Sequence, residues 1–244
     1  MIVPKIHRFD AVTSTNDVAI ELAHAGALVG TIVVASRQTR GKGRRGRTWL
    51  DEPGSNILMS AVLAENRPPS EYSQLSFTAS LAVAELLRSK CGLPAEIKWP
   101  NDVVVRGRKI AGILVEIALT RVGSTAVVGI GLNVRQTSFP DEIADIATSI
   151  ALQGGSCTDV DELIEALTES LFSIIETSFE EILARWRKYM WGIGKRAAVH
   201  TEGNIITGVI GGVDSIGALL LDLPNGARQS IVSADVLKLV TNHS

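Results

Sequence analysis

The chain has 244 residues, of which 45% are hydrophobic and 20% are charged, and its net charge is −2 at neutral pH. This length predicts one large domain, or one large domain with a small second one, and the composition excludes a disordered or fibrous chain. The even balance of acidic and basic residues gives no overall sign of a nucleic-acid binder, so we expect no nucleic-acid partner.

Cysteine and histidine usage favours a protein of the reducing cytoplasm. The two cysteines, Cys91 and Cys157, are too few for a disulfide framework and lie far apart in the sequence, and the four histidines are scattered, so we expect no zinc cluster. No apolar run approaches the roughly 18 residues of a membrane span, and the N-terminus lacks the layout of a signal peptide. We therefore expect a cytoplasmic chain with no membrane partner.

The N-terminal part of the sequence alternates between strand and helix patterns. Lys5–Val12 alternates apolar and polar residues, which predicts a strand. Ser14 or Thr15 can cap the helix that follows, and Gly26 suits the left-handed position just past its end. Short apolar runs then predict two buried strands, and a segment with one apolar face predicts an amphipathic helix. These elements are Thr31–Ser36, Asn56–Leu63 and Gln74–Lys90.

A run of strands follows the amphipathic helix. Short turns separate four mostly apolar segments, which predicts an antiparallel meander. These segments are Glu96–Lys98, Val103–Val105, Lys109–Ala118 and Thr125–Val134.

The C-terminal part changes from helix to short strands. A helical stretch is expected from about Thr158 to Tyr189, because its apolar residues recur at helical spacing. From Lys195 on, short strands separated by turns are typical of a small all-β barrel. We place the boundary near residue 193, which divides the chain into domains of residues 1–193 and 194–244.

A strongly basic segment, Arg37–Arg47, connects the two buried strands. Six of its eleven residues are Lys or Arg, and three are glycine. Glycines let backbone N–H groups approach a ligand, and closely spaced cations make a strong anion site. The spacing does not match the phosphate-binding pattern GxxxxGK[ST]. A solvated basic loop is the alternative, but the mutual repulsion of its cations favours an anion site.

The motif Lys98–Asp102 (KWPND) forms the turn between two predicted strands. Pro100 makes the turn rigid, so that Lys98, Asn101 and Asp102 are presented together. A lysine that neutralises phosphate and an aspartate that holds Mg²⁺ suit nucleotide triphosphate chemistry. The alternative is a turn with a purely structural role.

A third group of residues lies on two neighbouring predicted strands. Lys109 begins an otherwise apolar strand, in which Gly112 leaves room for a ligand to lie against the sheet. The strand that follows carries Gly129, Gly131 and Asn133, which again leaves an open face. A lysine that is simply solvated at a strand end is the alternative.

Several common catalytic arrangements do not occur in the sequence. There is no Gly-x-Ser-x-Gly motif, no cysteine in a cationic motif and no pair of histidines at metal-binding spacing. Covalent and zinc-dependent hydrolysis are therefore disfavoured. The chemistry that remains is done by positive charge, which can bring two anions together and stabilise a pentavalent phosphorus.

Taken in order, five motifs resemble those of the biotin protein ligases. The resemblance implies an α+β fold, with a mixed-sheet catalytic domain of the biotin/lipoate ligase (class II synthetase-like) type and an SH3-like C-terminal domain. The family usually has Arg where this chain has Lys42, so the charge is kept and bidentate hydrogen bonding is lost. The motifs are Ser14–Asn16, Gln38 with Gly41–Trp49, Lys98–Asp102, Lys109–Leu114 and Gly129–Asn133.

The resemblance also implies a two-step reaction and a set of site residues. Biotin and Mg·ATP would give biotinyl-5′-AMP and pyrophosphate, and biotin would then pass to a lysine of a carboxylase acceptor domain. Arg44 and Lys109 would be the catalytic residues, with Asp102 directed towards Mg²⁺. The biotin-binding residues would be Ser14, Thr15, Asn16, Gln38, Lys42, Gly43, Arg44 and Lys109. The ATP-binding residues would be Arg47, Trp49, Lys98, Asn101 and Asn133.

Within this family, the resemblance points to a ligase without an N-terminal DNA-binding domain, because the substrate motif already begins at Ser14. The expected partner is the biotin-carboxyl-carrier domain of a carboxylase, and a monomer or a homodimer both remain open. Two rival functions also remain. One is lipoate or octanoate transfer on the same fold, and the other is a non-enzymatic protein whose Arg37–Arg47 segment binds nucleic-acid phosphates.

Overall fold

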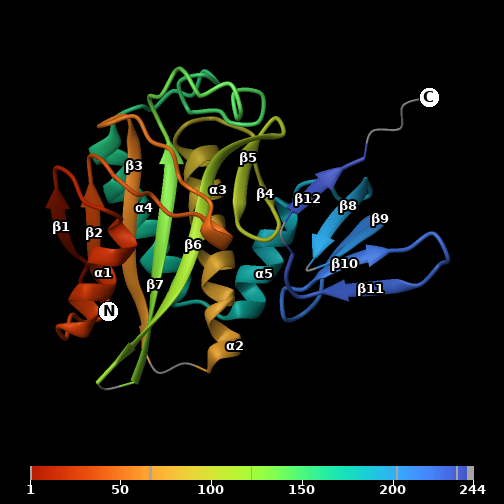
Figure 1. Cartoon of the computed structure of the whole chain (residues 1–244), viewed down its shortest axis with the longest axis horizontal. Coiled ribbons are helices and arrows are strands. Elements are labelled where there is room, and N and C mark those ends of the chain that lie inside the picture. Colours follow the sequence, from red (N-terminus) through yellow and green to blue (C-terminus); the bar gives the residue numbers. More distant parts are fainter. Residues whose placement is uncertain (1, 66–67, 122, 202, 235, 241–244) are drawn as a thin grey trace.

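The computed structural model describes residues 2–65, 68–121, 123–201, 203–234 and 236–240, and its strands form two separate sheets (Figure 1). In the seven-stranded sheet, β1 runs parallel to β2 and the other neighbouring strands are antiparallel. Its spatial order is β1 (Lys5–Phe9), β2 (Thr31–Ala35), β3 (Asn56–Glu65), β7 (Gly123–Asn133), β6 (Arg108–Thr120), β5 (Asp102–Val105) and β4 (Ala95–Lys98).

The second sheet is antiparallel and belongs to the C-terminal part of the chain. Its order is β11 (Arg228–Ile231), β10 (Leu219–Asp222), β9 (Asn204–Val213), β8 (Arg196–Thr201) and β12 (Val236–Leu239). A mixed sheet followed by a small all-β unit confirms the predicted α+β fold class. The predicted boundary near residue 193 stays a prediction, although the second sheet begins at β8.

Helices cover both faces of the seven-stranded sheet (Figure 1). On one face, α1 (Thr15–His24) packs Ala19 against Val33, Val62 and Val127. On the other face, α3 (Gln74–Ser89) and α4 (Val160–Ile175) cover the main core. The apolar stripe of α3 is buried as predicted, because its members recur every three or four residues. They are Leu75, Ala79, Ala82, Val83, Leu86 and Leu87.

The helical stretch predicted over residues 158–189 is divided in two. After α4, a second helix, α5 (Phe179–Lys188), begins at a capping box in which Ser178 and Glu181 bond to each other's backbone N–H groups. This local cap starts a new helix in a new direction, which the apolar periodicity does not reveal. The short helix α2 (Pro69–Tyr72) and the strand β12 were not predicted.

The two cysteines, although far apart in the sequence, lie close together in the fold. Cys91 follows α3 and Cys157 precedes α4, and the structure joins them by a disulfide with their Cα atoms 5.0 Å apart. The N–H of Ser156 also donates to Cys91 O at 3.1 Å, so the two segments run side by side. Separation in the sequence gave no measure of distance here, because α3 and α4 pack against each other.

Among the described residues, none of the helices is both long enough and apolar enough to cross a membrane.

The turn between β4 and β5 contacts the loop that connects β9 and β10 of the second sheet. The Trp99 side chain is buried, and its Nε1–H donates to Gly217 O at 3.0 Å. Phe77 of α3 lies under the same glycine, where an added Cβ would be 2.6 Å from the ring. Arg187 of α5 donates to Val213 O at 2.9 Å and to Asp214 O at 3.0 Å. The β4–β5 turn is therefore anchored to the β9–β10 loop of the second sheet.

We expect Trp99→Phe to lower the free energy of unfolding by about 1–3 kcal/mol, because the buried carbonyl of Gly217 loses its donor. Urea denaturation measures this loss. Trp186→Phe is the matched control, since this buried indole of α5 donates to Ser80 Oγ of α3 instead of to the C-terminal part of the chain. Both variants should lose stability, but only Trp99→Phe should increase protease cleavage between α5 and β8. Equal cleavage in the two variants would contradict this role of Trp99.

Candidate functional site

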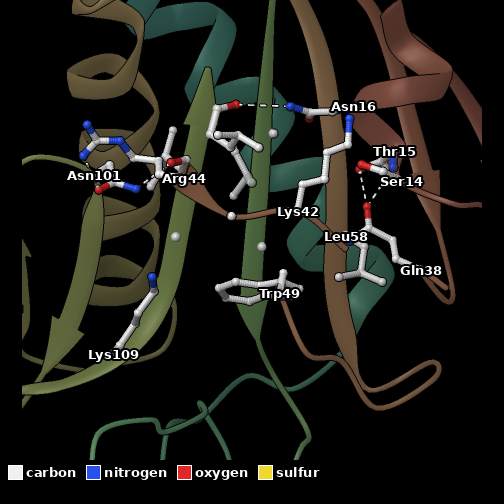
Figure 2. A pocket seen from close by; sticks show the side chains of 17 residues that line it. Ser14, Thr15, Asn16, Gln38, Lys42, Arg44, Trp49, Leu58, Asn101 and Lys109 are labelled. Atoms are coloured by element: carbon white, nitrogen blue, oxygen red, sulfur yellow. Dashed lines mark hydrogen bonds between the residues drawn. The ribbon is translucent and has the colours of Figure 1, made fainter. Parts of the chain in front are cut away.

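The predicted site residues converge on one face of β6 and β7, beneath the basic segment (Figure 2). Two adjoining cavities lie there. The first is lined by Ser14, Thr15, Asn16, Gln38 and Lys42, and the second by Arg47, Lys98 and Asp102. Gly43, Arg44, Trp49, Asn101 and Lys109 line both. Residues that are far apart in the sequence thus form one continuous site.

Asn133 is the exception among the predicted residues, because it lines neither cavity. Its side chain is buried at the end of β7, and its Nδ2 donates to Thr148 O at 2.9 Å. Its Oδ1 is buried without a hydrogen-bond partner among the described residues. In this position Asn133 supports the segment around Thr148 and does not line the site, so its role toward ATP stays a prediction.

Glycines form the floor of the site. Gly112 of β6 pairs with Gly131 of β7, and the Trp49 indole lies on both. A Cβ at residue 131 would be 2.5 Å from Trp49 Cε2, and one at residue 112 would be 3.1 Å from Cζ3. The glycines therefore leave space, as predicted, but the chain's own tryptophan fills it. The Trp49 Nε1–H is buried there without an acceptor among the described residues.

The polar end of the first cavity is built at the start of α1. Ser14 occupies the N-cap position but makes no side-chain cap hydrogen bond, so its predicted capping role is wrong. Thr15 does not cap the helix either, since it is the first helical residue. Instead, its backbone N–H and its hydroxyl donate to Gln38 Oε1 at 2.7 and 3.1 Å. Gln38 is thereby fixed with its amide oxygen towards the helix N-terminus.

Ser60 of β3 completes this polar end and was missed in the sequence. Its hydroxyl oxygen lies 2.7 Å from Thr15 Oγ1 and 2.6 Å from Asn16 Oδ1. A hydroxyl has one proton, so Ser60 can donate to only one of them at a time. The only signal for it was a single serine in an apolar strand, which is too weak to identify a site residue.

Two carboxylates hold the basic segment at the first cavity, and neither was singled out from the sequence. Lys42 forms an ion pair with Asp17 of α1 and lies 3.8 Å from Glu116 Oε1 of β6. The hydrogen bond to Asp17 raises the pKa of Lys42, against the opposing effect of burial. Glu116 Oε2 also accepts a hydrogen bond from Asn16 Nδ2 at 2.7 Å.

The second cavity gathers cations around the β4–β5 turn. Arg44 donates to Asn101 Oδ1 at 3.2 Å, and Asn101 Nδ2 donates to Ile113 O at 2.8 Å. Burial lowers the pKa of Arg44, and the neighbouring cation of Arg45 lowers it further. Burial likewise lowers the pKa of Lys98, whose Nζ lies 5.1 Å from the centre of the Trp191 ring. Partial burial of like charges makes this cavity suited to an anion.

Asp102 is the carboxylate that faces these cations. Its Oδ1 lies 2.6 Å from Lys109 Nζ, yet this buried oxygen receives no aligned hydrogen bond from the described residues. The two side chains are therefore held together by charge and not by a directional bond. Lys109 is fixed through its backbone, because its N–H donates to Ile146 O at 2.7 Å and its carbonyl accepts from Thr148 N at 2.8 Å.

Comparison with known proteins identifies the family. Residues 8–133 match the biotin/lipoate A/B protein ligase family, and residues 192–239 match the biotin protein ligase C-terminal domain. This chain belongs to the biotin protein ligase family. It is 35% identical over 233 residues to a biotin–[acetyl-CoA-carboxylase] ligase of Paracoccus denitrificans, which covers 91% of this chain and 96% of that relative.

Two further similarities support membership in the biotin protein ligase family. The chain is 36% identical over 235 residues to a bifunctional ligase/repressor BirA of Bacillus spizizenii, covering 93% of this chain and 72% of that relative. It also resembles the solved structure of a biotin protein ligase from Aquifex aeolicus in complex with biotin and ATP. That similarity has a TM-score of 0.84 at 30% identity and covers 97% of this chain and 99% of the other.

We expect Gly131→Ala to displace the Trp49 ring, because the added methyl would lie 2.5 Å from Cε2 and is fixed to the backbone of β7. The indole should then become more exposed to solvent, and its fluorescence emission should shift to longer wavelength. The difference spectrum against the same variant with Trp49→Phe isolates this ring from the other tryptophans.

Gly129→Ala is the matched control for this prediction. It adds the same methyl to the same strand, but there the methyl would meet the Asn16 amide instead of the indole. Its Trp49 emission should equal that of the wild type. An unchanged emission in Gly131→Ala would show that the ring does not lie on the glycine floor.

Proposed function

We propose that this chain is an ATP-dependent biotin protein ligase that activates biotin to biotinyl-5′-AMP and transfers it to a lysine of a biotin-carboxyl-carrier domain. The observation that carries the proposal is the pair of adjoining cavities. One is lined by hydrogen-bonding side chains, the other by cations, and Arg44 and Lys109 line both. Such an arrangement suits two anions that must be brought together.

In the first step, a carboxylate oxygen of biotin bonds to the α-phosphorus of ATP and pyrophosphate leaves. Both reactants are negatively charged, so their approach is unfavourable unless cations neutralise them. Lys109 and Arg44 stand where the cavities meet, and we assign them to the carboxylate and the α-phosphate oxygens. Lys98 and Arg47, which line the second cavity and not the first, are assigned to the remaining phosphates. Trp49 and Asn101 would complete the ATP side.

In the second step, the amine of the acceptor lysine attacks the acyl carbon, and AMP leaves as the amide bond forms. The activated intermediate is sensitive to water, so it must stay enclosed until the acceptor arrives. The basic segment covers the site and is held by contacts of Lys42 at one side and Arg44 at the other. We assign Gly43 and these two cations to the closure of the segment.

The first cavity favours biotin over a lipoyl or octanoyl group. Ser14, Thr15, Asn16 and Gln38 present donors and acceptors to its polar end. A ureido ring has two N–H groups and a carbonyl, whereas a dithiolane ring or an alkyl chain would leave such groups unpaired. Unpaired buried polar groups cost about 1–3 kcal/mol each, which is enough to discriminate between these ligands.

Mg²⁺ is expected to accompany ATP, and Asp102 fits it. Its buried Oδ1 receives no aligned hydrogen bond from the part of the chain that the structure describes, and a carboxylate oxygen is a preferred ligand of this ion. No cluster of three or more metal-binding side chains occurs within the described residues. Asp102 would therefore hold the ion together with the phosphates, and the ion would neutralise phosphate charge when bound. We further assign the chain to the cytoplasm, with either a monomer or a homodimer compatible with this function.

Incubation with ATP, labelled biotin and a biotin-carboxyl-carrier domain tests the proposal. We expect label on one lysine of the acceptor and pyrophosphate released with each turnover. Labelled octanoate and lipoate serve as competing substrates. Incorporation of either in place of biotin would overturn the assignment of the substrate.

We expect Lys109→Ala to weaken biotin binding by about tenfold to a hundredfold, because a charge-assisted contact of about 1.5–3 kcal/mol is lost. The adenylation rate should fall further than the affinity, since negative charge concentrates as phosphorus is attacked. Lys109→Arg should restore activity only in part, because a planar fork does not replace a compact ammonium. Single-turnover adenylation measures both. A change below about twofold in both quantities would instead fit a solvated strand-end lysine.

The lowered pKa of Lys98 predicts a pH dependence of ATP binding. Burial favours the neutral amine in the free protein, and a bound triphosphate favours the ammonium, so binding takes up a proton above the free pKa. ATP affinity should therefore fall as pH rises through that pKa, by up to about tenfold per pH unit. Titration calorimetry across the alkaline range measures the fall. Lys98→Arg should flatten it, because guanidinium stays charged, and an equally steep fall in that variant would refute the assignment.

A further inference from the structure

We propose that Glu116 is a positioning residue that fixes the orientation of the Asn16 amide and so makes Asn16 an acceptor for a ureido N–H of biotin. The proposal rests on the proposed function, since it concerns how the same site selects its substrate. Glu116 lies on β6, two and four residues beyond Leu114 and Gly112, and therefore on the same face as the site floor.

The contacts of Asn16 determine which way its amide is turned, and they leave Oδ1 with room for a second donor besides Ser60 Oγ, which lies 2.6 Å away. Nδ2 donates to Glu116 Oε2 at 2.7 Å and to Leu114 O at 3.4 Å (the second bond is drawn in Figure 2). Both amide hydrogens are thus used by β6. The oxygen, Oδ1, is left on the side of Ser60 and of Gly129, where an added Cβ would collide with it. The residue is 3% exposed, so no bulk solvent competes for these bonds.

Leu114 O also accepts from Nδ2, but that bond is long, so the shorter bond to the Glu116 carboxylate is the stronger determinant of this orientation. An ionised carboxylate only accepts hydrogen bonds, so it binds the NH₂ end of a neighbouring amide and repels the oxygen end. Glutamine at the same position has both an acceptor and a donor, and it would satisfy either orientation of Asn16 by turning its own amide. Glu116 therefore specifies one orientation of the Asn16 amide, whereas glutamine, which has nearly the same shape, would accept either orientation.

The orientation matters for substrate choice. An amide oxygen in the cavity accepts from an N–H of a ureido ring, whereas an NH₂ group there would face that N–H donor to donor. Sites built around a buried hydrogen bond reject ligands that cannot form it far more strongly than apolar pockets do. Biotin methylated on a ureido nitrogen keeps the ring and loses one N–H, so it reports on this contact.

Glu116 also faces the basic segment through its second oxygen. Oε1 lies 3.8 Å from Lys42 Nζ, and Lys42 forms a closer ion pair with Asp17. Asp17 thus contacts the same lysine, whereas the NH₂ group of Asn16 bonds to Glu116 and Leu114. Asp17→Asn is therefore the matched control, because it removes one carboxylate from Lys42 and leaves the Glu116–Asn16 bond in place.

The test compares wild type, Glu116→Gln and Asp17→Asn in ATP–pyrophosphate exchange, with biotin and with biotin methylated on either ureido nitrogen. We expect Glu116→Gln to raise the KM for biotin about tenfold, with kcat and the KM for ATP within about threefold of wild type. The preference for biotin over at least one methylated analogue should shrink by a similar factor. Asp17→Asn should keep the wild-type preference.

A double-variant comparison separates positioning from a general structural role. If Glu116 acts through Asn16, then Glu116→Gln added to Asn16→Ala should change neither the KM for biotin nor the preference any further. Additive effects, or an unchanged preference in Glu116→Gln, would overturn the proposal. Should Glu116→Gln unfold, Glu116→Asp, which keeps the carboxylate, must retain the preference. A wild type that exchanges no pyrophosphate with biotin would instead refute the proposed function and this proposal with it.

Discussion

The arrangement of the site depends on keeping several cations close together around one carboxylate. Arg44, Lys98 and Lys109 line the second cavity, and Asp102 is the acid that faces them. Side chains of like charge separate unless the framework beneath them is rigid. Here the backbone supplies that rigidity. The β4–β5 turn is held by Trp99 against the second sheet, and the strand that begins near Lys109 is held by the segment around Thr148. The repulsion that remains favours any bound anion.

The two domains are therefore linked through the site as well as through their packing. Trp99 belongs to the same turn as Lys98 and Asp102. Its hydrogen bond to Gly217 O attaches that turn to the β9–β10 loop of the C-terminal sheet. Phe77 of α3 packs under the same glycine, so the helix layer, the turn and the second sheet meet at one point. Lys98 directly precedes Trp99 in the chain, so a displacement of Trp99 at this contact would also displace the Lys98 cation. This gives the small sheet a structural role in positioning charge.

Local patterns predicted most of the elements and most of the site, and long-range pairing accounts for what they missed. The turn at Lys98–Asp102 and the glycines of β6 and β7 can be predicted from the sequence, because their roles depend on residues that are near neighbours in the chain. The role of Glu116 cannot be predicted in that way, since its partner Asn16 lies 100 residues away in the sequence. The capping box at Ser178 is local, but it competes with a continuous apolar stripe that suggests one helix. The disulfide between Cys91 and Cys157 follows from the packing of α3 on α4, which no single-sequence pattern specifies.

Groups of the chain itself occupy the positions that the substrates are proposed to take. Asp102 is paired with Lys109, and the Trp49 indole lies on the glycine floor. A phosphate or carboxylate that reaches Lys109 must compete with Asp102, and a ring that settles on Gly112 and Gly131 must displace the indole. Each competing contact is weak in a specific way, since Asp102 Oδ1 lacks an aligned hydrogen bond and the Trp49 N–H lacks an acceptor among the described residues. Because these contacts leave polar groups unsatisfied, their replacement by a ligand that satisfies them is favourable. By contrast, Thr15, Asn16 and Gln38 are already held by hydrogen bonds within the chain, so the polar end of the site is preorganised.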